Sequence, residues 1–277
     1  GGGAGVGFDA TGAPRGAMGV DRMRFEADGA QAIAIGNFST EMTALYTATP
    51  GSALFADDAA AAGLGAITRP DLTFGVLWAD LDLDGRPELI AANGHLEPHI
   101  ARVQPGISYE QPPRIFWNAG DDAGLRFQAL TAAEVGEDFV QPFVGRAVAA
   151  AGVDLDGDLD LLFTCLGGRP RLFRNEQSLG RRWLRVTVAG SGQNTGALGA
   201  TVSVTGGGRT QIKTVQPTRG YLTQIELPLS FGLGSATRAD SVRVRWPGGV
   251  ERTFDDIDVD RSIQLGRPET GETLTED

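Results

Sequence analysis

The segment Asp80–Glu88 concentrates four carboxylates in one short stretch of the chain. They occupy loop positions 1, 3, 5 and 9, with Gly85 at position 6: Asp80, Asp82, Asp84 and Glu88. Negative charges packed so closely repel each other unless a cation gathers them. Ca²⁺ takes about six to eight oxygen ligands, and a glycine-containing loop can wrap them around the ion, with the Arg86 backbone carbonyl as a further ligand. The loop is therefore predicted to bind calcium, and the alternative is a solvated acidic hairpin.

Two other segments share this arrangement but carry fewer usable carboxylates. The later one has Gly152 at position 1, followed by four acidic residues: Asp154, Asp156, Asp158 and Asp160. It has lost one anionic ligand, so we predict weaker calcium binding. The earlier one departs further at positions 1, 3, 5 and 9: Arg24, Glu26, Asp28 and Ala32. A cation where the first metal ligand belongs predicts a structural loop without metal.

The remaining reactive side chains indicate no second site. His95 and His99 stand four residues apart, a spacing that could hold zinc on a helix. Pro98 falls between them and disfavours a helix, so both histidines are predicted to be structural or solvated. Cys165 is the only cysteine; it follows an apolar run and is predicted to be a buried, inert thiol that forms no internal disulfide.

Sequence motifs of enzymes are absent. The chain has no Gly-x-Ser-x-Gly elbow, phosphate-binding loop or kinase set, and Gly232-Leu233-Gly234 lacks the third glycine of a dinucleotide fingerprint. Paired carboxylates could serve glycoside chemistry, but here they stand at metal-loop spacing. We therefore expect a protein without catalytic turnover.

Composition excludes further classes of function. The chain has 277 residues, 24 Lys and Arg against 35 Asp and Glu, and a net charge of −11. Nucleic-acid binding requires a basic face and is not expected. No apolar run approaches the roughly 20 residues of a membrane span. The first residues, GGGAGVGFDA, contain neither an initiator Met nor a signal sequence, so we expect that the chain starts inside a longer protein whose signal peptide lies upstream.

The acidic loops belong to three repeats of one plan. Each has an apolar run, a DG turn among acidic residues, a second apolar run and an aromatic segment, centred on Gly29, Gly85 and Gly157. The runs are short and bounded by turn signals, as is typical of strands. An insertion, His95–Pro113, lengthens the second repeat, and alanine-rich helical turns are expected at Phe55–Gly63 and Phe127–Gly136. Repeated units of this kind predict an all-β structure with about three β-propeller blades over residues 1–178.

The pattern changes after this region. From Trp183 the chain alternates apolar and polar residues between clusters of glycine, for example in Thr201–Val204 and Val242–Trp246. Such alternation is typical of strands with one buried face. We expect a small antiparallel, β-sandwich-like domain over residues 179–265 and a flexible acidic tail over 266–277.

These segments together resemble a known family. The run Phe74–His95 resembles the FG-GAP/VCBS propeller repeat, and more narrowly that of the ASPIC/UnbV group, the cartilage acidic protein-like family. The downstream motifs resemble the ASPIC/UnbV domain itself: Gly199–Val202, Arg219–Gln224, Phe231–Gly234 and Val242–Gly249. The resemblance covers about residues 14–265. It implies calcium ligands at Asp80, Asp82, Asp84 and Glu88, where Glu88 replaces the usual Asp.

The resemblance also implies a setting and a role. We expect an extracellular, periplasmic or cell-surface protein: a C-terminal fragment of a propeller of about seven blades, acting as a calcium-stabilised adhesion or interaction module. Its protein or glycan partner is unknown. The alternative is a cell-envelope protein that binds or modifies carbohydrate, with Tyr109 and Trp117 beside a sugar groove. A purely structural piece of a surface assembly is a third possibility.

Overall fold

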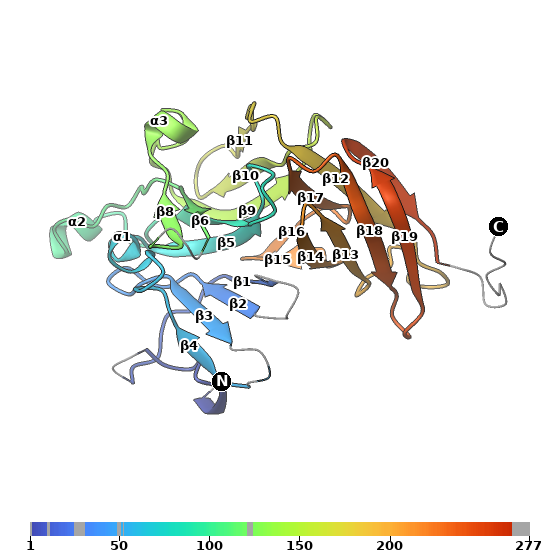
Figure 1. Ribbon diagram of the computed structural model, residues 1–277. Coiled ribbons are helices and arrows are strands. Elements are labelled where there is room, and N and C mark those ends of the chain that lie inside the picture. The colour runs from blue at the N-terminus through green and yellow to red at the C-terminus, as the bar shows by residue number, and fades with distance from the viewer. Residues whose placement is uncertain are drawn as a thin grey trace, which may run out of the picture.

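The computed structural model describes residues 2–9, 12–24, 31–48, 51, 53–120 and 124–267. Within these residues the protein is all-β, with twenty strands in six sheets and only single-turn helices. The sheets of the N-terminal part follow one another in a propeller-like arrangement, and the C-terminal strands form a separate body beside them (Figure 1).

The first two repeats form four-stranded antiparallel sheets with sequential strand order. The first sheet contains β1 (Val20–Arg24), β2 (Gln31–Ile35), β3 (Ala44–Ala48) and β4 (Phe55–Asp57). The second contains β5 (Thr73–Ala79), β6 (Glu88–Asn93), β7 (Arg114–Asn118) and β8 (Phe127–Ala129). The apolar runs of the sequence thus form the predicted strands, and the Asp80 loop joins β5 to β6.

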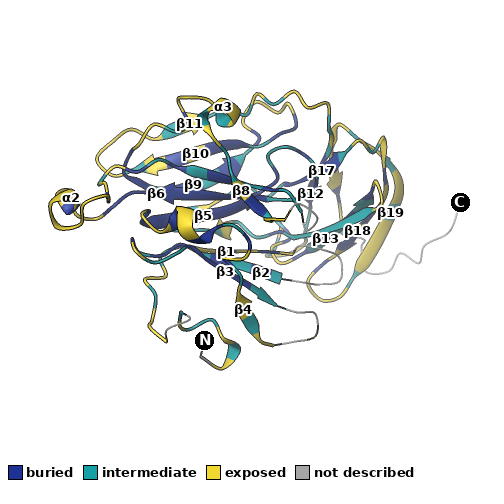
Figure 2. Ribbon diagram, turned by 60° about the vertical axis from the view of Figure 1, so that its left-hand side comes forward, coloured by how far each residue is buried: buried dark blue, intermediate teal, exposed yellow. Residues whose placement is uncertain are grey.

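The third repeat forms a three-stranded sheet of the same kind. Its strands are β9 (Gly145–Ala151), β10 (Asp160–Cys165) and β11 (Arg171–Phe173), with β10 in the centre. The second sheet is buried on both faces because it lies between the other two (Figure 2). Alternate residues of β5 show this, since Val76 and Trp78 pack toward the first sheet whereas Leu77 and Ala79 pack toward the third.

Short helices lie in the connections between strands. They are α1 (Gly65–Thr68), α2 (Ile100–Val103) and α3 (Ala132–Val135), preceded near the N-terminus by the 3-10 turn η1 (Gly2–Ala4). The helical turn expected in Phe127–Gly136 is present, with a capping box between Thr131 and Glu134. The one expected in Phe55–Gly63 is not a helix: Phe55–Asp57 form β4, Ala59–Gly63 form turns, and α1 starts only after Gly63. The insertion His95–Pro113 contains α2.

The C-terminal strands form two main sheets and a short ribbon. One sheet has the order β17 (Leu229–Gly234), β12 (Arg182–Val188), β20 (Arg261–Leu265). The other has the order β14 (Arg209–Thr214), β13 (Thr201–Gly206), β18 (Arg238–Arg245), β19 (Glu251–Asp258). The ribbon pairs β15 (Thr218–Arg219) with β16 (Thr223–Gln224). Apolar side chains from both sheets share one core around Phe231 and Trp246.

One pairing differs from the purely antiparallel expectation. β12 and β20 are parallel, with Leu184 opposite Arg261 and Val188 opposite Leu265. Alternation in a strand indicates which face is buried but not the direction of the neighbouring strand, so the sequence pattern could not distinguish the two cases. β20 ends at Leu265. Of the predicted tail, residues 268–277 lie outside the described residues.

The two parts of the chain meet through polar and apolar contacts, including a ring contact between Phe74 and Tyr221. Asp21 of β1 is buried and accepts hydrogen bonds from Arg219 of β15 and from the Trp78 backbone N–H. A cavity of about 130 Å³ lies between β1, the end of β5 and β14.

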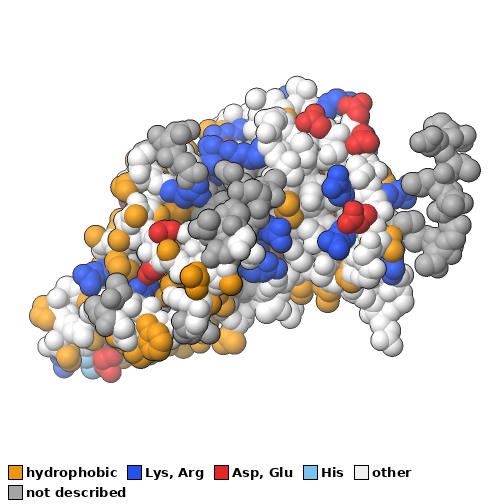
Figure 3. Space-filling view, turned by 60° about the horizontal axis from the view of Figure 1, so that its bottom comes forward, with side chains coloured by type: hydrophobic (Ala, Val, Ile, Leu, Met, Phe, Trp, Pro, Cys, Tyr) orange, Lys and Arg blue, Asp and Glu red, His pale blue; other side chains and the backbone are white. Residues whose placement is uncertain are grey.

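On the face seen in Figure 3, hydrophobic side chains gather toward the left, and Lys and Arg lie in several separate groups. No helix among the described residues is long and apolar enough to cross a membrane.

Candidate metal centre

The Asp80 loop has a tight backbone that turns its acidic side chains inward. Leu83 has φ of 60° and Gly85 has φ of 83°, so the chain reverses within a few residues. A leucine in this region is strained, whereas glycine is not. The later loop repeats the geometry, with φ of 64° at Leu155 and 114° at Gly157. The two loops therefore share one backbone design, as their aligned sequences predict.

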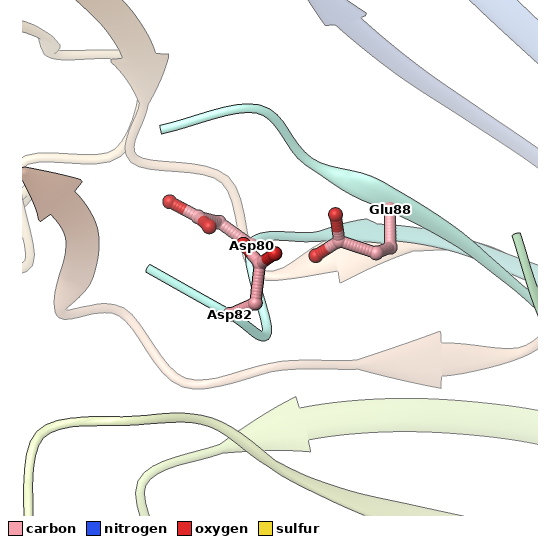
Figure 4. A group of neighbouring side chains, drawn as sticks. All are labelled: Asp80, Asp82 and Glu88. Atoms are coloured by element: carbon pink, nitrogen blue, oxygen red, sulfur yellow. The ribbon is translucent and has the colours of Figure 1, made fainter. Parts of the chain in front are cut away.

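Three of the four predicted side-chain ligands come together. Asp80, Asp82 and Glu88 each offer a carboxylate oxygen, and these oxygens all lie within 4.8 Å of one another. Figure 4 shows the Asp82 carboxylate turned toward Glu88, with the Asp80 carboxylate on the other side of Asp82. Asp80 and Glu88 are only 2% and 1% exposed, so the group is shielded from solvent on the side of the sheets.

Backbone N–H groups orient the carboxylates. Asp84 N–H donates to Asp80 Oδ1 at 3.1 Å, and Gly85 N–H donates to Asp80 Oδ2 at 3.0 Å. Leu81 N–H donates to Glu88 Oε2 at 2.7 Å. These bonds arise within the loop itself, which explains why the acidic residues need this spacing around the glycine.

Cations of the chain itself compensate part of the charge. Asp84 pairs with Arg86, and both lie outside the three-carboxylate group. Arg181 lies 2.6 Å from Asp82 Oδ2, and Lys213 of β14 is close enough to stabilise the charge of Asp80. Four carboxylates thus face three cations. Lys213 is thus shared between Asp80 and Glu88, and the buried Oε1 of Glu88 has no hydrogen-bond partner.

Burial makes ionisation of this group costly. Desolvation, aided by the neighbouring carboxylates Asp84 and Asp82, raises the pKa of Asp80 to about 6. Desolvation and the charge of Asp80 raise the pKa of Glu88 well above its usual range. Near neutral pH the group must therefore hold a proton or a cation. An all-oxygen donor set suits a hard divalent ion, and Ca²⁺ tolerates the irregular geometry better than Mg²⁺ does.

The later loop is less suited to metal. Asp154 pairs with Arg174, and Asp160 accepts backbone N–H groups from Val153 and Asn175. The loop forms no group of three carboxylates within metal-binding distance in the described part of the chain. Asp158 is buried, and desolvation together with Asp156 and Asp160 raises its pKa to about 7.

The other candidate residues have structural roles or fall outside the described region. In the earlier loop, Glu26 and Asp28 lie outside the described residues, so its predicted lack of metal stays a prediction. His95 is buried; its Nε2 is 3.2 Å from Ser39 Oγ, and its Nδ1 accepts the Glu97 N–H, which confirms a structural role. Cys165 is half-buried and not buried as predicted, because it lies near the end of β10; desolvation still raises the pKa of its thiol, which favours the protonated form.

Sequence reasoning missed the residues that reach the loop from distant segments. Trp117 of β7 donates its indole N–H to Asp82 Oδ2 at 2.9 Å, and Arg181 also bonds to the Asp82 carbonyl at 2.8 Å. Gly232 of β17 donates its N–H to Asp80 Oδ2 at 3.1 Å. Nothing local marks these residues as loop partners. The one sequence signal is the motif Phe231–Gly234, which resembles part of the ASPIC/UnbV domain and contains Gly232.

Comparison with known proteins finds two similarities. Residues 190–272 match the family model described as ASPIC and UnbV. The chain is also 29% identical over 139 residues to cartilage acidic protein 1 of Xenopus tropicalis. That match covers 47% of this chain and 21% of the relative, so the chain corresponds to a small part of the longer protein. The predicted ASPIC/UnbV resemblance is thus supported.

Proposed function

We propose that the protein is an extracellular interaction module, in which a calcium ion stabilises an FG-GAP/VCBS-type propeller that carries an ASPIC/UnbV domain. The observation that carries the calcium proposal is the buried Glu88, whose unpartnered Oε1 belongs to a group with Asp80 and Asp82. An anion buried without a partner is costly, and a divalent cation would compensate it. The ASPIC/UnbV match and the propeller-like sheets support the interaction role.

In this proposal the N-terminal sheets are three blades of a propeller and the C-terminal sheets form a sandwich-like domain. The packing of successive sheets through apolar faces supports the blades. The single core between two sheets supports the sandwich. The acidic loops lie at equivalent places in successive blades, as a repeat origin requires.

The proposed role is not catalytic. General acid–base or nucleophilic chemistry needs a reactive group next to a base in an accessible site. Both ring nitrogens of His95 are engaged, and the Cys165 thiol is held protonated by its raised pKa. For the carbohydrate alternative, the indole N–H of Trp117 is engaged by Asp82 and does not serve as a donor to a sugar. A glycan array and a polysaccharide-degradation screen would detect that alternative.

Calorimetric titration of calcium into chelator-treated protein tests the proposal. We expect one dominant site with a Kd of about 10⁻⁴ to 10⁻³ M, as is usual for extracellular modules, and weaker binding of magnesium. The variant Asp80→Asn should lose this site, whereas Asp240→Asn, an exposed position in β18, serves as the matched control. Absence of calcium binding by the parent protein would contradict the proposal.

A further inference from the structure

The Asp80 loop also contacts the C-terminal domain directly, through β17. Gly232 N–H donates to Asp80 Oδ2, and Gly234 N–H donates to the Leu83 carbonyl at 2.9 Å. A Cβ atom added to Gly232 would overlap Asp80 Oδ2 and the backbone of Leu83. The glycines of the Phe231–Gly234 motif thus let β17 approach the acidic loop.

Asp80 serves both sides of this contact. Its Oδ2 accepts two N–H groups, one from Gly85 in the loop and one from Gly232 in the other domain. Its Oδ1 accepts only the Asp84 N–H and keeps a lone pair for a cation. A cation at Oδ1 and the domain contact at Oδ2 are therefore compatible, and both require one orientation of the Asp80 carboxylate.

The later loop also meets the C-terminal strands, through Gly157 against Trp183 and Gly152 N–H to Glu226, but its tip is not covered in the same way. Leu83 and Leu155 occupy equivalent positions with the same left-handed backbone. Leu83 is 2% exposed because it lies under the C-terminal domain, whereas Leu155 is 73% exposed. The loop that gathers three carboxylates is therefore the loop whose tip is covered by β17.

We propose that occupancy of the cation site controls how firmly the C-terminal domain is docked on the second sheet, through Asp80. The proposal rests on the cation site proposed above. Without a cation, repulsion among Asp80, Asp82 and Glu88 disfavours the orientation of Asp80 that receives the Gly232 N–H. With a cation, that orientation is fixed and the contact is strengthened. Coupling of this kind is reciprocal, so loss of the domain contact weakens cation binding.

Hydrogen exchange of the whole chain, with calcium and with chelator, measures the coupling. Calcium should slow exchange of the Gly232 and Gly234 amides by about tenfold, within the usual range for coupled sites. The Val202 and Val204 amides in β13 are the internal control, because they lie in the core of the domain. Unchanged protection at Gly232 and Gly234, with calcium binding intact by calorimetry, would overturn the coupling but leave the cation site standing. Absence of calcium binding would overturn both.

A substitution provides the reciprocal test. Gly232→Ala should weaken calcium binding by about tenfold, because the added Cβ displaces Asp80. Gly266→Ala is the matched control, since a Cβ there meets no atom within 4 Å. Equal calcium affinity in both variants would contradict the proposal. If Gly232→Ala fails to fold, the exchange experiment on the parent chain decides the question alone.

Discussion

Replacing Glu88 by glutamine separates the cation site from the stability of the fold. Glu88→Gln keeps the size of the side chain and an oxygen to accept the Leu81 N–H, but removes the negative charge of a carboxylate whose Oε1 has no hydrogen-bond partner. In the absence of metal the variant should be at least as stable as the parent protein. The raised pKa of Glu88 indicates that its ionised form is disfavoured in the folded state.

The calcium-dependent rise in Tm should change far more in Glu88→Gln than the stability of the metal-free protein does. At about 100 times Kd, one site adds about 2.7 kcal/mol to the stability of the parent protein. At about 2–4 °C per kcal/mol, this raises Tm by about 5–11 °C. A divalent ion and a carboxylate about 4 Å apart attract each other by about 8 kcal/mol at an effective dielectric constant of about 20, before dehydration is subtracted. If Glu88→Gln binds calcium 100-fold more weakly, the lost binding free energy is about 2.7 kcal/mol, which is only part of this attraction.

The assay is thermal unfolding with calcium and with chelator. After a 100-fold loss of affinity, the same calcium concentration adds only about 0.4 kcal/mol, or about 1–2 °C in Tm. Glu110→Gln, at an exposed position of the His95–Pro113 insertion, should keep the full rise of the parent protein. A full calcium-dependent rise in Glu88→Gln would refute the assignment of Glu88 as a ligand.

Three further outcomes are expected. Asp82→Ala should remove most of the calcium-dependent rise in Tm and Asp156→Ala much less, because only Asp82 belongs to the three-carboxylate group; equal losses would show that the loops are equivalent. Metal-free protein should lose stability as the pH rises from about 4 to about 6. The pKa of Asp80 is raised to about 6 in the folded state, so the folded state binds this proton more tightly than the unfolded state does. The loss of unfolding free energy through this group reaches about 3 kcal/mol. Urea unfolding across this pH range measures it, and a stability that rises over the interval would contradict it. Leu83→Ala should cost about 2–5 kcal/mol and Leu155→Ala less than about 0.5 kcal/mol by urea unfolding, because only Leu83 is buried; similar costs would disprove the contact with β17.

Much of the fold follows from local sequence signals. Apolar runs on both sides of a DG turn predict β5 and β6, and their hydrogen-bonded register agrees with this. The spacing of Asp80, Asp82 and Glu88 predicts the carboxylate group, since side chains two residues apart in a tight loop turn to the same side. These features depend on residues that are neighbours in the chain, and such interactions leave a readable pattern.

The remaining features depend on residues that are distant in the chain. Asp84 has the spacing of a ligand, but its carboxylate pairs with Arg86, and a spacing rule does not describe this competition. Arg181, Lys213 and Gly232 contact the loop from segments that lie far along the chain. No periodicity connects them to Asp80. The parallel partner of β12 is hidden for the same reason, because it lies at the other end of the domain.

The parallel pairing of β12 with β20 also sets an order of events during synthesis. Among the described strands of the C-terminal part, β12 is the first and β20 the last, so one edge of β12 stays open until β20 has been synthesised. The N-terminal sheets, which are built from neighbouring strands, can fold while translation continues. The acidic loop is then complete before β17 can cover it. A nascent chain therefore exposes the Asp80 carboxylate group to the ions of its compartment before the domain closes over it.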